Sequence, residues 1–87
     1  MNKYCIYVIK SDIHNRIYIG SSSDVDSRLK YHNTGKVFST KPYRPWRLIY
    51  QESFALKKDA LKRERQIKSS GLIRKALKKE TYHGPIV

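Results

Sequence analysis

The sequence predicts an α+β domain in which a small three-stranded antiparallel sheet is flanked by helices, in the order β-β-α-β-α-α. Three observations support this fold class: two short aromatic and β-branched runs near the N-terminus, a third such run in mid-chain, and helical spacing of apolar residues between and after them. A chain of 87 residues can close one modest core. We therefore expect a single domain over 1–87, with a core from about 4 to 79 and a loosely ordered tail over 80–87.

The first two runs are expected to form a β-hairpin. Residues 4–10, YCIYVIK, are apolar on both faces and too few for a typical helix. Residues 11–15 supply turn-forming Ser, Asp and Asn, and strand character resumes over 16–20. Because side chains alternate between the faces of a strand, Tyr7 and Tyr18 are expected to share one face.

A helix is expected over residues 24–33, because Ser and Asp N-cap candidates precede it and Gly35 follows it. Arg28 and His32 are four residues apart, so they lie on the side of this helix that carries its apolar residues. That side turns toward the sheet. The pattern therefore directs a charged group inward, which is costly without a partner.

The remainder of the chain predicts a polar surface loop over 35–45, a strand over 46–53 and helices over 56–69 and 72–79. The first of these two helices carries an apolar stripe, made of Leu56, Ala60, Leu61 and Ile67. Glu64 lies in the middle of that stripe, where a carboxylate is unusual.

Charge narrows the choice of partner. The chain has 19 Lys and Arg against 7 Asp and Glu, a formal net charge of +12, which favours a polyanionic partner. A membrane surface is the least favoured partner, because no large apolar helix face accompanies the cations. Eight cations are predicted to contact a nucleic-acid backbone: Lys36, Lys41, Arg44, Arg47, Lys62, Arg63, Arg65 and Lys68.

Several classes of protein are excluded. The single Cys5 cannot support an intramolecular disulfide framework and is expected to be a small buried hydrophobe, and one Cys with three scattered His makes no zinc pattern. The N-terminus lacks the basic and apolar regions of a secretory signal, so we expect a cytoplasmic protein.

Five inward-facing polar residues, drawn from four elements, suggest a reaction: Tyr7, Tyr18, Arg28, His32 and Glu64. Metal-assisted phosphodiester cleavage needs a carboxylate to hold a divalent ion, a cation beside the phosphate and a base to activate water. The residue types meet these needs. Taken alone, the two tyrosines are better explained as core aromatics with satisfied hydroxyl groups than as catalysts.

The order and spacing of these residues resemble the GIY-YIG nuclease superfamily, and most closely its small single-domain bacterial members. The resemblance extends from Tyr4 to about Leu77. It rests on Cys5-Ile6-Tyr7, on Tyr18-Ile19-Gly20 after a ten-residue gap, on Arg28 and His32, and on Glu64 in the Ala60–Ile67 helix. These members are related to the nuclease modules of excinuclease and of structure-specific nucleases.

The resemblance implies a role for each matched residue. Glu64 would be the ligand of a single Mg²⁺ or Mn²⁺, Tyr7 would activate the attacking water, and Tyr18 would orient water or phosphate. A phenol is a poor base at neutral pH, so Tyr7 needs a cation, the metal or His32 nearby.

The other matched residues would support this centre. Arg28 would bind the scissile phosphate, His32 would hydrogen-bond the phenol, and Gly20 would let the backbone pack tightly where the second strand ends. Two features depart from the family pattern: Cys5 stands at the first Gly position, and no Asn follows Glu64.

By the same resemblance, the chain would be a metal-dependent endonuclease or nickase acting on DNA, with a role in DNA repair. With phosphate contacts alone, it would select structure, such as branched or single-stranded DNA, and not base sequence, with RNA as a further possible substrate. We expect a monomer or weak dimer. The alternative is a catalytically inactive basic DNA- or RNA-binding module with the same fold.

Overall fold

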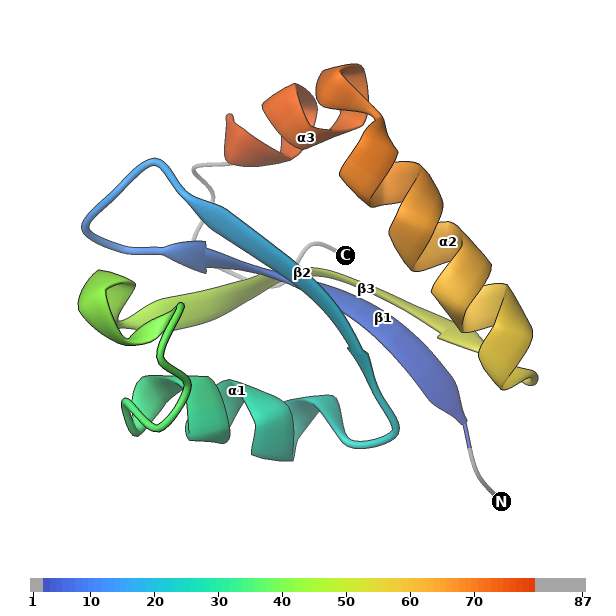
Figure 1. Ribbon diagram of the computed structural model, residues 1–87, viewed down its shortest axis with the longest axis horizontal. Helices are drawn as coiled ribbons and strands as arrows, with labels where there is room; N and C mark the ends of the chain where they lie inside the picture. The colour runs from blue at the N-terminus through green and yellow to red at the C-terminus, as the bar shows by residue number, and fades with distance from the viewer. Residues whose placement is uncertain (1–2, 80–87) are drawn as a thin grey trace.

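The computed structural model describes residues 3–79, so the loosely ordered tail predicted for 80–87 lies outside the described residues. Residues 3–79 form three strands and three α-helices, whose arrangement Figure 1 shows, and their order confirms the predicted fold class. The elements are β1 (Tyr4–Ser11), β2 (Ile17–Ser22), α1 (Val25–Asn33), the 3₁₀ turn η1 (Lys41–Tyr43), β3 (Trp46–Phe54), α2 (Lys57–Ser69) and α3 (Gly71–Lys78).

The sheet has the strand order β2-β1-β3, and both pairings are antiparallel. In the hairpin register, Tyr7 lies opposite Gly20 and Ile9 lies opposite Tyr18. The rings of Tyr7 and Tyr18 are 6.2 Å apart between centroids, which confirms that they share a face. β2 is an edge strand, so its outer side is free to border a site.

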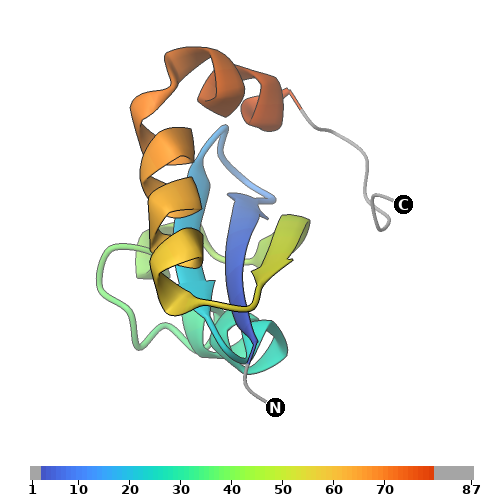
Figure 2. The same cartoon turned by 90° about the vertical axis from the view of Figure 1, so that its right-hand side faces the viewer.

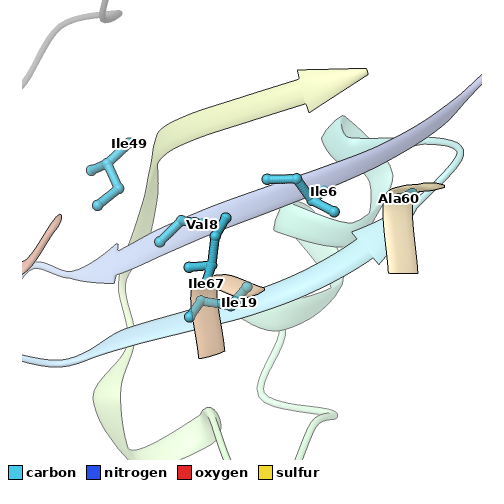
Figure 3. Close-up of a cluster of buried hydrophobic side chains, with 6 residues drawn as sticks. All are labelled: Ile6, Val8, Ile19, Ile49, Ala60 and Ile67. Carbon is cyan, nitrogen blue, oxygen red and sulfur yellow. The ribbon is translucent and has the colours of Figure 1, made fainter. Parts of the chain in front are cut away.

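Helix α2 covers one face of the sheet. Alternate residues of β1 and β2 point into this layer, and Figure 3 shows them around two residues of α2. The buried cluster consists of Ile6, Val8, Ile19, Ile49, Ala60 and Ile67. The apolar stripe of α2 is narrower than predicted, because Leu61 is exposed and Leu56 precedes the first helical residue.

Helix α1 covers the opposite face, and Figures 1 and 2 show the two helices on different sides of the sheet. Val25 of α1 packs there with Trp46 of β3 and with alternate residues of β1. Cys5 belongs to this cluster and is 6% exposed, which confirms a small buried hydrophobe. The carboxylate of Asp24 caps α1 by accepting hydrogen bonds from the backbone N–H and the hydroxyl of Ser27.

Within residues 3–79, no helix is both long enough and apolar enough to cross a lipid bilayer.

Candidate active site

Tyr7 lies at the centre of the candidate site, on the middle strand and against α1. Its hydroxyl oxygen is 2.9 Å from Nε2 of His32, and both side chains are buried. A Cβ on Gly20, the cross-strand neighbour, would stand 2.8 Å from the Tyr7 hydroxyl oxygen and 2.9 Å from Cζ. The phenol therefore lies directly over a backbone that only glycine can provide. The sequence predicted tight packing at Gly20, and the structure shows that the group packed there is Tyr7.

The other ring nitrogen of His32 fixes its tautomer. Nδ1 is 3.0 Å from Oγ1 of Thr40, and that hydroxyl donates to the carbonyl of Val37 at 3.4 Å. We assign the proton to Nδ1, which donates to Thr40, because this tautomer leaves Nε2 able to accept the hydroxyl of Tyr7 and satisfies all three groups. Burial, and then the positive charge of Arg28, lower the pKa of His32. The imidazole is therefore neutral at neutral pH.

The loop over 35–45 is held against this site by Trp46 and Asn33, two residues that the sequence did not predict to take part. The indole Nε1 of Trp46 donates to the carbonyl of Thr40 at 2.9 Å. Asn33 donates to the carbonyl of Trp46 at 3.0 Å and accepts from its backbone N–H at 2.7 Å. This loop was predicted to be a surface arm, and Thr40 anchors it in the interior with 2% exposure.

Arg28 and Tyr18 complete the group around the phenol. The Tyr18 ring lies 4.6 Å from the His32 ring between centroids, and Arg28 is half-buried with its guanidinium beside the hydroxyl of Tyr7. Burial raises the pKa of Tyr7 above its usual value, and the nearby guanidinium of Arg28 only partly opposes that effect. The phenol therefore keeps its proton at neutral pH unless His32 accepts it.

Glu64 approaches from α2, on the other face of the sheet. Its side chain is 16% exposed, and Oε2 is 2.7 Å from Nζ of Lys68 one helical turn later. The negative charge of Glu64 acts to raise the pKa of Tyr7, so the carboxylate lies within electrostatic reach of the phenol. Tyr7, Tyr18, Arg28 and His32 therefore gather on the α1 face of the sheet, and Glu64 is linked to them from α2 through the effect of its charge on the pKa of Tyr7.

The donor atoms at this site fit one hard divalent ion. Within residues 3–79, no group of three or more His, Cys, Asp or Glu gathers to form a protein-only metal cage. Mg²⁺ commonly binds through one or two carboxylates, keeps several waters and takes further oxygens from substrate phosphate. Glu64 is the largely buried carboxylate that would supply such a ligand, and it would exchange its ion pair with Lys68 for the metal.

The eight cations predicted to contact nucleic acid have different surroundings. Three form ion pairs: Arg47 with Asp12, Arg63 with Glu52 at 3.0 Å, and Lys68 with Glu64. The guanidinium of Arg44 packs against the backbone of Gly35, which has φ +85°. Within residues 3–79, the others are exposed and have no acidic partner: Lys36, Lys41, Lys62 and Arg65.

The depressed pKa of His32 predicts how stability depends on pH. Between that pKa and the ordinary histidine value of 6.5, the unfolded chain binds a proton that the folded chain does not. The neutral, buried imidazole of His32 therefore contributes to the free energy of unfolding above pH 6.5. That contribution should be lost as pH drops below this value. Urea unfolding at several pH values tests this. His32→Gln should show a shallower pH dependence over the same range, and equal slopes would contradict the prediction.

Comparison with known proteins identifies the family to which this chain belongs. The family profile described as the GIY-YIG catalytic domain matches residues 3–76. A UPF0213 protein of Staphylococcus epidermidis is 41% identical over 70 residues, covering 79% of this chain and 84% of that protein. A UPF0213 protein of Staphylococcus haemolyticus is 40% identical over the same shares of the two chains.

A solved structure agrees with these sequence relatives. The solution NMR structure of a UPF0213 protein from Bacillus halodurans superimposes with a TM-score of 0.53 at 28% identity, and the match covers 85% of this chain and 79% of that one. It shares the three-stranded antiparallel sheet flanked by helices. The motif residues, the fold and the profile match agree, and the chain belongs to the GIY-YIG catalytic domain family.

Proposed function

We propose that this chain is a metal-dependent endonuclease or nickase that hydrolyses phosphodiester bonds in DNA. The observation that carries the proposal is the hydrogen-bonded series from the Tyr7 hydroxyl through His32 to Thr40, buried beside Arg28. A structural tyrosine needs one partner for its hydroxyl. This one has a neutral imidazole aligned to take its proton and a guanidinium beside its oxygen.

The series supports proton transfer away from an attacking water. As the water oxygen attacks phosphorus, its proton passes to the oxygen of Tyr7, and the phenol proton passes to Nε2 of His32. The bond from phosphorus to the 3′ oxygen breaks, which leaves a 5′-phosphate and a 3′-hydroxyl once solvent protonates the leaving oxygen. Burial and Arg28 disfavour the imidazolium, so His32 returns the proton through Tyr7 after the step.

Arg28 and Tyr18 would hold the phosphate. The half-buried guanidinium of Arg28 offers fixed positive charge where negative charge develops. Tyr18, whose ring lies beside that of His32, would orient the water or phosphate through its hydroxyl. A Mg²⁺ or Mn²⁺ held by Glu64 would add charge stabilisation at the phosphate.

Selection of structure and not sequence is proposed from the loop over 35–45. Phe38 is 91% exposed on that loop, next to a hollow of about 880 Å³ that is also lined by Lys41 and Tyr43. An exposed ring beside cations suits an unpaired base stacked over a phosphate backbone. One site of this kind cuts one strand, so a monomer or weak dimer would nick branched DNA and cleave single-stranded DNA.

The rival function is a catalytically inactive module that binds DNA or RNA. The pairing of Glu64 with Lys68 favours it, because this ion pair already neutralises the carboxylate that would hold the metal. Such a module would bind nucleic acid with steep salt dependence and leave it intact.

Cleavage by the purified wild-type chain tests the proposal. Labelled branched, single-stranded and duplex DNA, with single-stranded RNA in parallel, are incubated with Mg²⁺, Mn²⁺ or EDTA. We expect cleavage of the DNA with either metal and none with EDTA, and nicks that DNA ligase reseals because they carry 5′-phosphate and 3′-hydroxyl ends. Salt-sensitive binding without cleavage in either metal would support the inactive module.

A further inference from the structure

We propose that a cationic groove along the outer side of β2 binds the sugar-phosphate backbone of the nucleic-acid strand next to the cleaved bond. This inference rests on the proposed function. The groove is a hollow of about 420 Å³, and the residues that line it are Asn15, Arg16, Ile17, Tyr18, Ile19, Lys68, Arg74 and Lys78.

The lining of this groove matches a phosphodiester backbone. Four of its eight residues are cationic, none is acidic, and Ile17 and Ile19 contribute an apolar wall. The four cations come from three places in the chain: the hairpin before β2, the end of α2, and the middle and last residue of α3. A groove with cations along its length suits successive phosphates of a strand better than a single small anion.

Two of these cations, Arg74 and Lys78, lie on α3, and the sequence alone did not single them out. Ser70 caps α3 by accepting a hydrogen bond from the backbone N–H of Ile73 at 3.1 Å. Ile73 and Leu77, four residues apart, pack against the core under α2. Arg74 and Lys78 each follow one of these anchors, so they share the adjacent side of the helix and both line the groove.

The groove joins the candidate active site directly. Tyr18 lines the groove, and its ring lies 4.6 Å from that of His32. Lys68 also lines the groove, and its ammonium is 2.7 Å from the carboxylate of Glu64. Lys68 therefore screens an approaching phosphate from Glu64, which would otherwise repel it.

The groove also continues toward the loop over 35–45. Arg16 lines both this groove and the larger hollow beside Phe38, and its guanidinium lies 4.2 Å from the ring centroid of Tyr43. Arg16 lies in the connection between β1 and β2 and lines both hollows, so the two hollows meet at this residue. A bound nucleic-acid strand would therefore run from the loop over 35–45, past Tyr18, to α3.

Binding in EDTA tests the groove independently of cleavage. Anisotropy of fluorescein-labelled single-stranded and duplex oligonucleotides is titrated over a range of salt concentrations for two variants of equal charge. One is Arg74→Gln with Lys78→Gln. The control is Lys57→Gln with Lys58→Gln, exposed residues at the other end of the 13-residue α2, about 20 Å away along its axis.

The groove variant should bind roughly tenfold more weakly at moderate salt. The slope of log K against log salt should become shallower by about 0.7 per lost contact on single strands and about 0.9 on duplex. The control variant should retain the wild-type slope. Equal losses in both variants would overturn the proposal, because net charge alone would then explain binding.

Cleavage measured beside binding separates this inference from the proposed function. At subsaturating DNA with Mg²⁺, the groove variant should cleave more slowly in proportion to its weaker binding, whereas the control variant at Lys57 and Lys58, outside the groove, should keep the wild-type rate. If the wild-type chain cleaves DNA and the groove and control variants bind it equally well, the groove proposal is wrong and the endonuclease proposal stands. If only the groove variant binds more weakly and the wild-type chain does not cleave DNA, the endonuclease proposal is wrong and the groove proposal stands. Thermal melting by circular dichroism confirms that each variant is folded.

Discussion

Tyr7→Phe is expected to reduce DNA cleavage by about 10³-fold. The substitution keeps the buried ring in place over Gly20 and removes only the oxygen that would pass a proton from water to His32. It also leaves Nε2 of His32 buried without its partner, which should lower the free energy of unfolding by about 1–3 kcal/mol. Single-turnover cleavage and urea unfolding measure the two effects separately.

Tyr50→Phe is the matched control for this prediction. It removes another tyrosine hydroxyl, one that bonds to Glu52 on β3 at 3.0 Å. Its cleavage rate should stay within about twofold of wild type, because that hydrogen bond lies outside the proton path. A Tyr7→Phe variant that cleaves as fast as Tyr50→Phe would show that the phenol oxygen takes no part in the reaction.

Gly20→Ala is expected to affect both stability and cleavage. The new Cβ would stand 2.8 Å from the hydroxyl oxygen of Tyr7 and 3.0 Å from Cε2 of Tyr18, closer than packed carbon atoms approach. Because Tyr7 is only 1% exposed, its ring has little room to move away. We expect a loss of about 1–3 kcal/mol in the free energy of unfolding. Misalignment of the phenol should slow cleavage by about 10²-fold.

Gly71→Ala provides the comparison, because a Cβ there meets nothing within 4 Å and no positive φ is involved. Gly71 is the first residue of α3, where alanine favours the helix, so stability should stay level or rise by a few tenths of a kcal/mol. Cleavage should not change. Similar losses in the two variants would contradict the account of Gly20 as the position that admits the phenol.

Local patterns were sufficient to predict most of the fold. Side-chain alternation placed Tyr7 and Tyr18 on one face, and a spacing of four residues turned His32 of α1 inward beside them. Such patterns hold because each strand or helix of a small domain must bury one face. Element ends differ by a residue or two where a local bond decides them, as at α3, which begins at Gly71 because Ser70 caps it.

The parts that sequence missed depend on contacts distant along the chain. Thr40 lies in a polar loop with no periodic pattern, and only the folded chain brings it to Nδ1 of His32. Arg47 pairs with Asp12, 35 residues away, which no helical or strand spacing predicts. The raised pKa of Tyr7 likewise follows from burial, which the residue type does not reveal.

The central claim is that the residues around Tyr7 form one metal-dependent hydrolytic site, and the cleavage rate of Glu64→Gln with Mg²⁺ tests it most directly. The matched variant is Glu52→Gln, which loses the same charge from a half-exposed ion pair with Arg63 that contributes little to stability. We predict a loss of about three orders of magnitude for Glu64→Gln, because the carboxylate holds the metal. Glu52→Gln should keep the wild-type rate. Glu64→Gln protein that is folded and cleaves DNA as fast as Glu52→Gln would contradict the claim.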